Sequence, residues 1–281
     1  MMHKTLGGDG MKIHHLNCGT MKISKILSAG RIPDHAVCHC LLIETRQGLV
    51  LIDSGIGTRD MVDPSRLGPT HYLLPVREDM DETALNQVLS LGYKTDDVRH
   101  IILTHLDLDH TGGIPDFPHA AIHVLLDEYR AAHNPSGFKE KNRYRKVHLA
   151  AAKSWETYEE RPGDEWFGFP CIKGLTGLPE EIILVPLRGH TKGHCGVAVA
   201  SGNGWLLHAG DAYYSARDMA PDPHCQLPFK LFEYLVHMDH SRAVLLKKRL
   251  WNLAYRSGAP VRVFCTHDPG EFEWFRLHAQ A

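Results

Sequence analysis

Four apolar runs in this chain are each followed, within a few residues, by histidine or aspartate, and this recurrence constrains the fold more than any other feature. The segments after the runs are Thr104-His105, Arg188-Gly189-His190, Ala209-Gly210-Asp211 and Thr266-His267-Asp268. The apolar runs alternate with amphipathic helical segments, which predicts a layered α/β architecture. Because rigid strands fix the first residues of the loops that follow them, we expect these four segments to contribute to one site.

Local signals predict several further elements along the chain. Residues 38–44 and 49–53 are expected to form a hairpin around a short polar turn. Asp81 is expected to cap a helix that ends at Gly92, and Ser241 to cap a second helix near the C-terminus.

Composition limits the classes of partner. The chain of 281 residues is 43% hydrophobic, which is enough to bury a full core. Its 31 Lys and Arg nearly balance 33 Asp and Glu, so binding to nucleic acid or to an acidic membrane is disfavoured. The seven cysteines are scattered without CxxC pairs, and we interpret them as reduced thiols.

The domain organisation is expected to be simple. No repeat or low-complexity tract marks a boundary, so residues 11–281 are predicted to form one domain, after a loose leader at residues 1–10. The N-terminal sequence lacks the apolar core of a signal peptide, and no apolar run approaches the roughly 18 residues of a membrane span. We therefore expect a cytoplasmic location.

The stretch THLDLDHTGG, residues 104–113, is the densest cluster of potential metal ligands. It places His105, Asp107, Asp109 and His110 close together, and imidazole is the commonest transition-metal ligand among side chains. The glycines at 112 and 113 are expected to let the backbone bend sharply, so that several of these side chains turn inward. For this motif alone, a solvated turn in which Asp109 caps a helix is an even alternative, but the other three polar strand ends make it much less favoured.

Together, the motifs resemble those of the metallo-β-lactamase superfamily, whose mark is HxHxDH followed by a distant histidine, aspartate and histidine. The matching segments are HLDLDH at 105–110, GHTKGH at 189–194, HAGD at 208–211 and CTHD at 265–268. The resemblance implies a four-layer αββα sandwich with a one- or two-metal site on one edge. The length, GHTKGH and the DxxY spacing from Asp211 to Tyr214 are most similar to the N-acyl-homoserine lactonase group.

The resemblance also implies a set of metal ligands. The first metal would be held by His105, His190 and Asp211, and the second by Asp109, His110, Asp211 and His267. Histidine and carboxylate ligands suit zinc, with manganese or iron as alternatives.

Asp107 departs from the family pattern, which usually has histidine at this position. A carboxylate is a harder and shorter ligand than imidazole, so Asp107 either ligates directly, binds through water or leaves the coordination incomplete. Three outcomes stay open: a carboxylate-rich pair that favours manganese or iron, a zinc pair with an altered first site, or a single occupied site.

Three further groups of polar residues have other expected roles. Asp53 either orients a ligating histidine or forms a turn. His194 is expected to make a structural hydrogen bond rather than to ligate. The sequence HMDH at 237–240 mimics a ligand cluster, but it precedes a helix and is expected to be a surface helix start.

The expected chemistry is hydrolysis by a metal-bound hydroxide, because two metals lower the pKa of a shared water toward neutrality. Asp109 is expected to move a proton in addition to its ligand role. By resemblance, the hydroxyl of Tyr214 would stabilise the tetrahedral oxyanion. Tyr213 is the alternate, because adjacent residues on a strand face opposite ways.

Residues 134–175 are expected to be an insertion that covers the pocket, since they follow no clean strand period. They combine the basic run KEKNRYRK with Trp155, Tyr158, Trp166, Phe167 and Phe169. The aromatic residues would accept an acyl chain or ring, and the basic residues a substrate carboxylate. The equal alternative is a helix with a solvated cationic face and an aromatic anchor.

These features predict a metal-dependent hydrolase that opens a small-molecule lactone or cleaves a related carboxylic ester. Within hydrolases, the alternatives are a thioesterase and a phosphodiesterase. Outside them, they are a diiron oxidoreductase, which Asp107 favours, and a non-catalytic ligand-binding protein on the same fold. No nucleic-acid or membrane partner is expected, and a homodimer is one option.

Overall fold

Two β-sheets that pack face to face form the centre of the fold. The computed structural model describes residues 11–24, 33–202, 204–219 and 227–278, so the leader predicted at residues 1–10 lies outside the described residues. The six-stranded sheet has the order β1 (Lys12–Lys22), β2 (His35–Thr45), β3 (Gly48–Ile52), β4 (Val98–Ile102), β5 (Ala121–Leu125) and β6 (Trp155–Tyr158). The four-stranded sheet has the order β12 (Val261–Phe264), β11 (Gly204–His208), β10 (Cys195–Ser201) and β9 (Ile182–Pro186). A short hairpin, β7 (Glu165–Trp166) and β8 (Phe169–Pro170), forms a separate two-stranded sheet.

Strand direction changes within each sheet. Strands β1 to β3 are antiparallel, as the predicted hairpin requires, and β3 to β6 run parallel to one another. In the four-stranded sheet only the β11–β12 pair is parallel. Parallel pairs need crossover connections, and these supply the helices.

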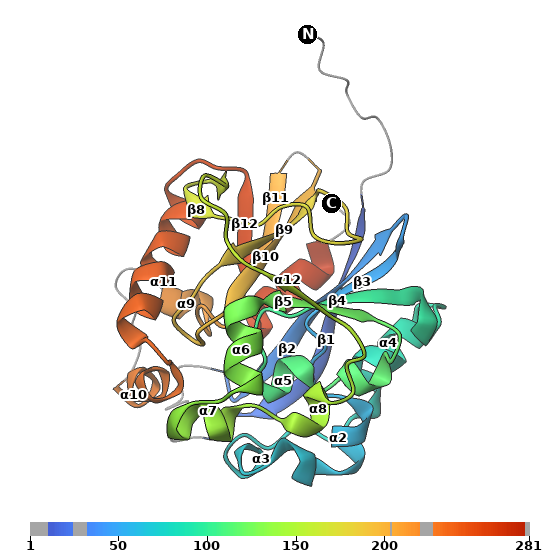
Figure 1. The fold of residues 1–281 in the computed structure, drawn as a ribbon. Helices are drawn as coiled ribbons and strands as arrows, with labels where there is room; N and C mark the ends of the chain where they lie inside the picture. Colours follow the sequence, from blue (N-terminus) through green and yellow to red (C-terminus); the bar gives the residue numbers. More distant parts are fainter. Residues whose placement is uncertain (1–10, 25–32, 203, 220–226, 279–281) are drawn as a thin grey trace.

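Helices lie outside both sheets (Figure 1). Before β9 they are α2 (Thr58–Val62), α3 (Thr70–Leu73), α4 (Ala84–Ser90), α5 (Leu108–Thr111), α6 (Leu126–His133), α7 (Gly137–Arg143) and α8 (Lys146–Leu149). After β11 they are α9 (Ala216–Met219), α10 (Leu227–Val236), α11 (His240–Tyr255) and α12 (Pro269–His278). Among the described helices, none is both long and apolar enough to cross a bilayer.

Alternating side chains divide the core into three apolar clusters. In β2, Cys40 and Leu42 pack toward α4, α5 and α8, whereas Leu41 and Ile43 pack into the core between the sheets. In β10, Val197 faces that central core, and its neighbour Ala198 faces α11. This period of two buries both faces of each sheet. Three cores separated by two sheets make the four-layer αββα sandwich, so the predicted fold class is confirmed.

The predicted helix caps are wrong by two residues. Helix α4 is capped by Thr83, whose Oγ1 accepts a hydrogen bond from the Asn86 N–H at 3.4 Å, and α11 by Asp239. Asp81 instead lies in a short 3₁₀ turn, and Ser241 lies inside α11. An N-cap needs extended backbone so that its side chain reaches back to the first turn, and sequence alone does not say which nearby polar residue adopts it.

Glu271 of α12 introduces a pH dependence into the stability of the fold. Its carboxylate accepts hydrogen bonds from the Tyr213 hydroxyl (2.9 Å) and the Cys265 N–H (2.8 Å). Burial raises the pKa of Glu271 from 4.5 to about 7. The folded protein therefore binds this proton more tightly than the unfolded chain does, so this group's contribution to the free energy of unfolding falls as pH rises between these two values.

We expect this contribution to fall by up to about 3 kcal/mol, because one pKa unit corresponds to about 1.4 kcal/mol. Urea denaturation at pH 5 and pH 7.5, on the wild type and on Glu271→Gln, measures the effect. The variant keeps a hydrogen-bonding side chain but cannot ionise, so its stability should vary less between the two pH values. The same pH dependence in both proteins would show that Glu271 does not carry it.

Candidate metal centre

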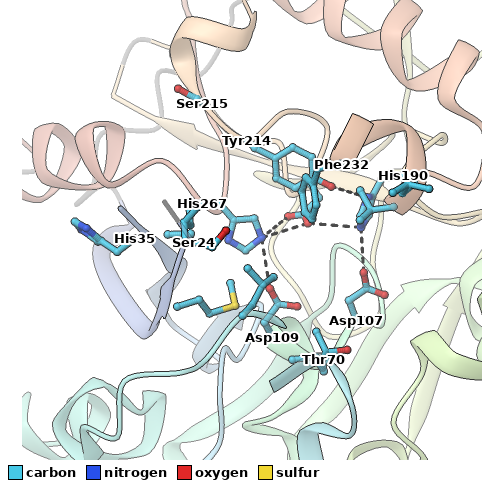
Figure 2. Close-up of a pocket in the computed structure, with 18 of the residues that line it drawn as sticks. Ser24, His35, Thr70, Asp107, Asp109, His190, Tyr214, Ser215, Phe232 and His267 are labelled. Carbon is cyan, nitrogen blue, oxygen red and sulfur yellow. Dashed lines mark hydrogen bonds and ion pairs between the residues drawn. The ribbon is translucent and has the colours of Figure 1, made fainter. Parts of the chain in front are cut away.

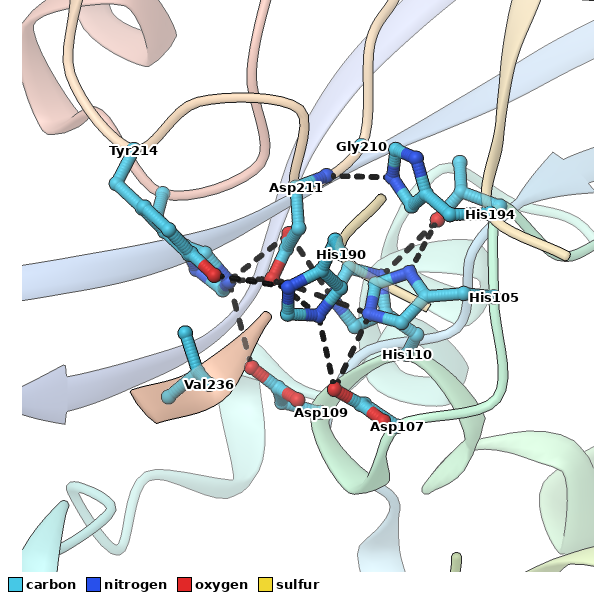
Figure 3. A network of polar contacts seen from close by, with 12 residues as sticks. His105, Asp107, Asp109, His110, His190, His194, Gly210, Asp211, Tyr214 and Val236 are labelled. Carbon is cyan, nitrogen blue, oxygen red and sulfur yellow. Dashed lines mark hydrogen bonds and ion pairs between the residues drawn. The ribbon is translucent and has the colours of Figure 1, made fainter. Parts of the chain in front are cut away.

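Four segments that follow strands bring histidine and aspartate side chains close together, and Figure 3 shows His105, His190 and Asp211 of this set. His105 follows β4 of the six-stranded sheet, whereas His190, Asp211 and His267 follow β9, β11 and β12 of the four-stranded sheet. Potential ligand atoms lie within 4.8 Å of one another in three overlapping groups: His105, Asp107 and His190; His105, His110 and Asp211; and Asp109, His110 and His267. The structure thus brings together all seven residues that are predicted from the sequence to be metal ligands. We call the first set the Asp107 group and the last the Asp109 group.

The four histidines share one orientation. Each uses Nδ1 for a hydrogen bond that points away from the centre: His105 to Thr104 Oγ1 (3.0 Å), His110 to Asp53 Oδ2 (2.8 Å), His190 to Tyr214 Oη (3.0 Å) and His267 to Val37 O (2.8 Å). Each Nε2 lies 3.0–3.4 Å from an oxygen of Asp107 or Asp211. Histidines that bind metals are held in this way, with the second ring nitrogen fixed by an outer partner.

Unpaired buried atoms indicate that a cation fits this centre. Within the described part of the chain, His105 Nε2, His110 Nε2, Asp107 Oδ1 and Asp211 Oδ1 are buried without a hydrogen-bond partner. Buried polar atoms of this kind are costly unless something satisfies them. A set of four imidazoles and three carboxylates suits divalent zinc, manganese or iron.

Electrostatics around the centre also favour bound cations. Burial by itself would lower the pKa of His267, but attraction to Asp211 and Asp109 outweighs it and raises this pKa to about 9. Burial likewise opposes the charged form of His110, yet Asp53, Asp211 and Asp109 hold its pKa well above the usual value. The carboxylates therefore attract positive charge strongly at this point.

The paired glycines after the motif serve close packing rather than a sharp bend. Gly112 and Gly113 have φ angles of −58° and −79°, which any residue adopts, so the predicted role is wrong. A Cβ atom on Gly112 would lie 2.6 Å from Asp60 Oδ2 and 2.7 Å from Gly55 O, and one on Gly113 would lie 2.5 Å from Ser54 O. Glycine lets α5, which carries Asp109 and His110, approach the loop after β3.

Asp53 and His194 support the centre from outside it. Asp53 accepts hydrogen bonds from the N–H and the hydroxyl of Thr104 and from His110 Nδ1, all at 2.8 Å, which matches the orienting alternative. His194 donates through Nδ1 to Leu187 O (2.8 Å), and its Nε2 accepts from the Asp211 N–H (2.9 Å). Both ring nitrogens of His194 are thus engaged by backbone, as expected of a structural histidine.

The HMDH sequence at 237–240 only partly forms a surface helix start. Asp239 is exposed and caps α11, but His237 is buried, and its ring centroid lies 5.6 Å from that of His190. Lys139 Nζ donates to the carbonyl of His237 at 3.0 Å. The expectation of a surface position is therefore wrong for His237, because the preceding α10 packs beside the centre.

Glu128 is a supporting residue that the sequence did not reveal. It is fully buried, and its two carboxylate oxygens accept the N–H groups of Leu106 (3.0 Å) and Gly193 (2.9 Å). It therefore ties the loop of the first motif to the GHTKGH loop. Its place in the first turn of α6 is typical of an exposed acidic residue, so no local signal distinguished it.

Arg143, from the basic run of the predicted insertion, contacts the Asp107 group directly. Its Nη1 lies 2.9 Å from Asp107 Oδ2 and 3.1 Å from His190 Nε2. Its Nη2 donates to the Val236 carbonyl of α10. The sequence predicts either a substrate carboxylate or solvent as the partner of this basic run, and neither alternative includes the contact with Asp107.

A cavity of about 660 Å³ opens above the cluster (Figure 2). Its floor includes Asp107, Asp109, His190, Asp211 and His267, and its walls are mainly apolar. The walls include Met21, Ile23, Tyr72, Leu74, Phe232, Leu235 and Val236.

From the stretch 134–175, Lys139, Asn142 and Arg143 line the cavity, but the five aromatic residues singled out there do not. Trp166 and Phe169 instead pack in the core beneath α11, so the expectation that they would hold an acyl chain is wrong.

The two adjacent tyrosines point to different places. The hydroxyl of Tyr214 is bonded to His190 Nδ1, and the residue lines the cavity. Tyr213 is fully buried, and its hydroxyl donates to Glu271. Of the two, Tyr214 is the one placed to meet a ligand, as the DxxY spacing favoured.

Comparison with known proteins gives one consistent family. The model of the metallo-beta-lactamase superfamily matches residues 34–256. A "Probable metallo-hydrolase" of Mycobacterium tuberculosis is 39% identical over 272 residues, which are 96% of this chain and 84% of the relative. An N-acyl homoserine lactonase of Azorhizobium caulinodans is 30% identical over 238 residues, which are 84% of this chain and 83% of the relative.

Solved structures show the same fold at low sequence identity. One is an N-acyl homoserine lactone hydrolase with N-hexanoyl-L-homoserine bound at its catalytic metal centre. It has a TM-score of 0.65 and 20% identity, and the match covers 94% of this chain and 95% of that one. A dizinc quorum-quenching lactonase matches with a TM-score of 0.64 and 18% identity, covering 92% and 88% of the two chains.

Proposed function

Because the chain belongs to the metallo-β-lactamase superfamily and is a metallo-hydrolase, we propose that it opens a lactone or cleaves a related carboxylic ester. The observation that carries this proposal is the position of the His and Asp cluster, at the floor of a mainly apolar cavity. Concave apolar sites with a few convergent polar groups are typical of small-molecule substrates. Relatives named as N-acyl homoserine lactonases support the choice of a lactone over other esters.

The cluster would hold two divalent ions, for which zinc is our first choice. His105, Asp107 and His190 would hold one and Asp109, His110 and His267 the other, with Asp211 between them. When bound, such ions polarise a carbonyl and lower the pKa of water toward neutrality.

Asp109 and Tyr214 would supply proton transfer and stabilisation of the oxyanion. Asp109 lines the cavity with one oxygen 3.5 Å from His267 Nε2. In this proposal it takes up a proton and passes it to the leaving oxygen. The Tyr214 oxygen would accept a hydrogen bond from His190 Nδ1–H, and its hydroxyl would donate a hydrogen bond to the oxyanion.

A substrate panel on defined metal forms tests the proposal. The full chain is stripped by chelation, reloaded separately with zinc, manganese or iron, and assayed on lactones, esters, thioesters and phosphodiesters. We expect metal-dependent turnover that is fastest on lactones and absent from the stripped protein. Faster thioester or phosphodiester hydrolysis would overturn the substrate class. Iron binding with redox-linked absorption and no hydrolysis would favour the oxidoreductase, and no metal binding would favour a ligand-binding protein.

A further inference from the structure

The Asp107 group and the Asp109 group differ in their contact with a positively charged side chain of the protein. The Arg143 guanidinium touches Asp107 and His190, which are two of the three residues of the Asp107 group. In the part of the chain that the structure describes, no lysine or arginine forms an ion pair with Asp109 or Asp211. The two groups have the same number of potential ligand atoms, three each within 4.8 Å of one another. They therefore differ in the neighbouring charge and not in the number of ligands.

Arg143 is held in this place by more than Asp107. Its side chain is 11% exposed, and its second terminal nitrogen donates to the Val236 carbonyl at the end of α10. A guanidinium presents several N–H donors in a fixed plane, so these contacts are made together. Moving Arg143 away from Asp107 would therefore break several contacts.

Asp107 and Arg143 form a matched pair. A neutral histidine at position 107, as in the family pattern, would offer a guanidinium no charge, whereas the carboxylate attracts it at 2.9 Å. The residue that departs from the pattern is thus the one that brings a positive side chain into the centre. A divalent ion in the Asp107 group would meet this positive charge at short range, where repulsion is strong.

We propose that Arg143 competes with metal for the Asp107 group, so that the two metal positions fill in order. The Asp109 group binds the first divalent ion tightly, and the Asp107 group binds the second weakly and reversibly. This inference rests on the proposed metal centre and adds a loading order, set by Arg143. Under low metal supply the protein would carry one ion.

Titration with Zn²⁺ alone tests this loading order without an activity assay. The metal-free full chain is titrated in competition with a chromophoric chelator of known affinity. We expect two binding steps that differ by at least about tenfold in affinity, since charge repulsion at contact distance is worth that much or more. His267→Ala should remove the tight step and His105→Ala the weak one.

Arg143→Met should tighten the weak step by about 10- to 100-fold, because it removes the positive charge beside Asp107, and it should leave the tight step unchanged, because Arg143 forms no ion pair with Asp109. The matched control is Lys141→Met, which loses the same charge from an exposed position on the same helix and should change neither step. Asp107→Asn, which keeps the side-chain shape, should weaken the weak step further. It is the second test if circular dichroism shows that Arg143→Met does not fold.

Two results would overturn the inference. They are two steps of equal affinity in the wild type, and a weak step that Arg143→Met, or Asp107→Asn in its place, leaves unchanged. A protein that binds no zinc at all would instead refute the proposed metal centre, so the two failures are distinguishable.

Discussion

Replacing His110 with alanine is expected to lower kcat/KM for the proposed lactone hydrolysis by about 1000-fold or more, a loss of about 4 kcal/mol in transition-state stabilisation. His110 is shared by two of the three overlapping ligand groups, so its loss affects more of the centre than the loss of a peripheral ligand would. Its Nε2 is buried, unpaired and 3.3 Å from Asp211 Oδ1. Without it, we expect the ion of the Asp109 group to be lost or misplaced.

The fold should survive this substitution. Asp53, which binds His110 Nδ1, keeps the hydrogen bonds from the Thr104 N–H and hydroxyl. Steady-state kinetics on matched protein, with metal content by mass spectrometry and folding by circular dichroism, separate the two effects. The control is His119→Ala, because His119 is 55% exposed and should affect neither activity nor metal content. Lactone hydrolysis at the wild-type rate in His110→Ala would refute the assignment of the centre.

The sequence allowed the fold and the approximate place of the centre to be predicted because both depend on short-range patterns. Short continuous apolar runs in β2 and β3 identify strands buried on both faces. Residues directly after rigid strands have little conformational freedom. The sequence therefore allows His105, His190, Asp211 and His267 to be assigned to one neighbourhood.

What the sequence could not supply are contacts between segments far apart in the chain. Glu128 looks like an ordinary first-turn acid of α6, and only the fold brings the N–H groups of Leu106 and Gly193 to it. Arg143 belongs to a basic run that is typical of a solvated face, yet it reaches Asp107, 36 residues away. The burial of His237 similarly depends on how α10 packs, which no local pattern encodes.

Gly112→Ala is expected to destabilise the fold by about 4 kcal/mol, which is large for adding one methyl group. A Cβ at this position would lie 2.6 Å from Asp60 Oδ2, 2.7 Å from Gly55 O and 2.7 Å from Gly57 N. Two of these neighbours are backbone atoms of the loop after β3, and Asp60 is buried between Arg66 and His148. None of them can move cheaply, so α5 must shift, together with Asp109 and His110.

The backbone angles of Gly112 make this substitution a clean test of packing. At φ −58° and ψ −35° alanine is comfortable, so any loss of stability comes from steric contact and not from conformational strain. The matched control is Gly270→Ala in α12, where the nearest atom to an added Cβ is Asp268 Oδ1 at 3.1 Å. Alanine favours helix, so the free energy of unfolding of this control should stay within about 1 kcal/mol of the wild-type value.

Urea denaturation of the wild type, Gly112→Ala and Gly270→Ala measures the difference in the free energy of unfolding. Equal stability of the two variants would mean that the close approach of α5 to the loop after β3 does not constrain position 112.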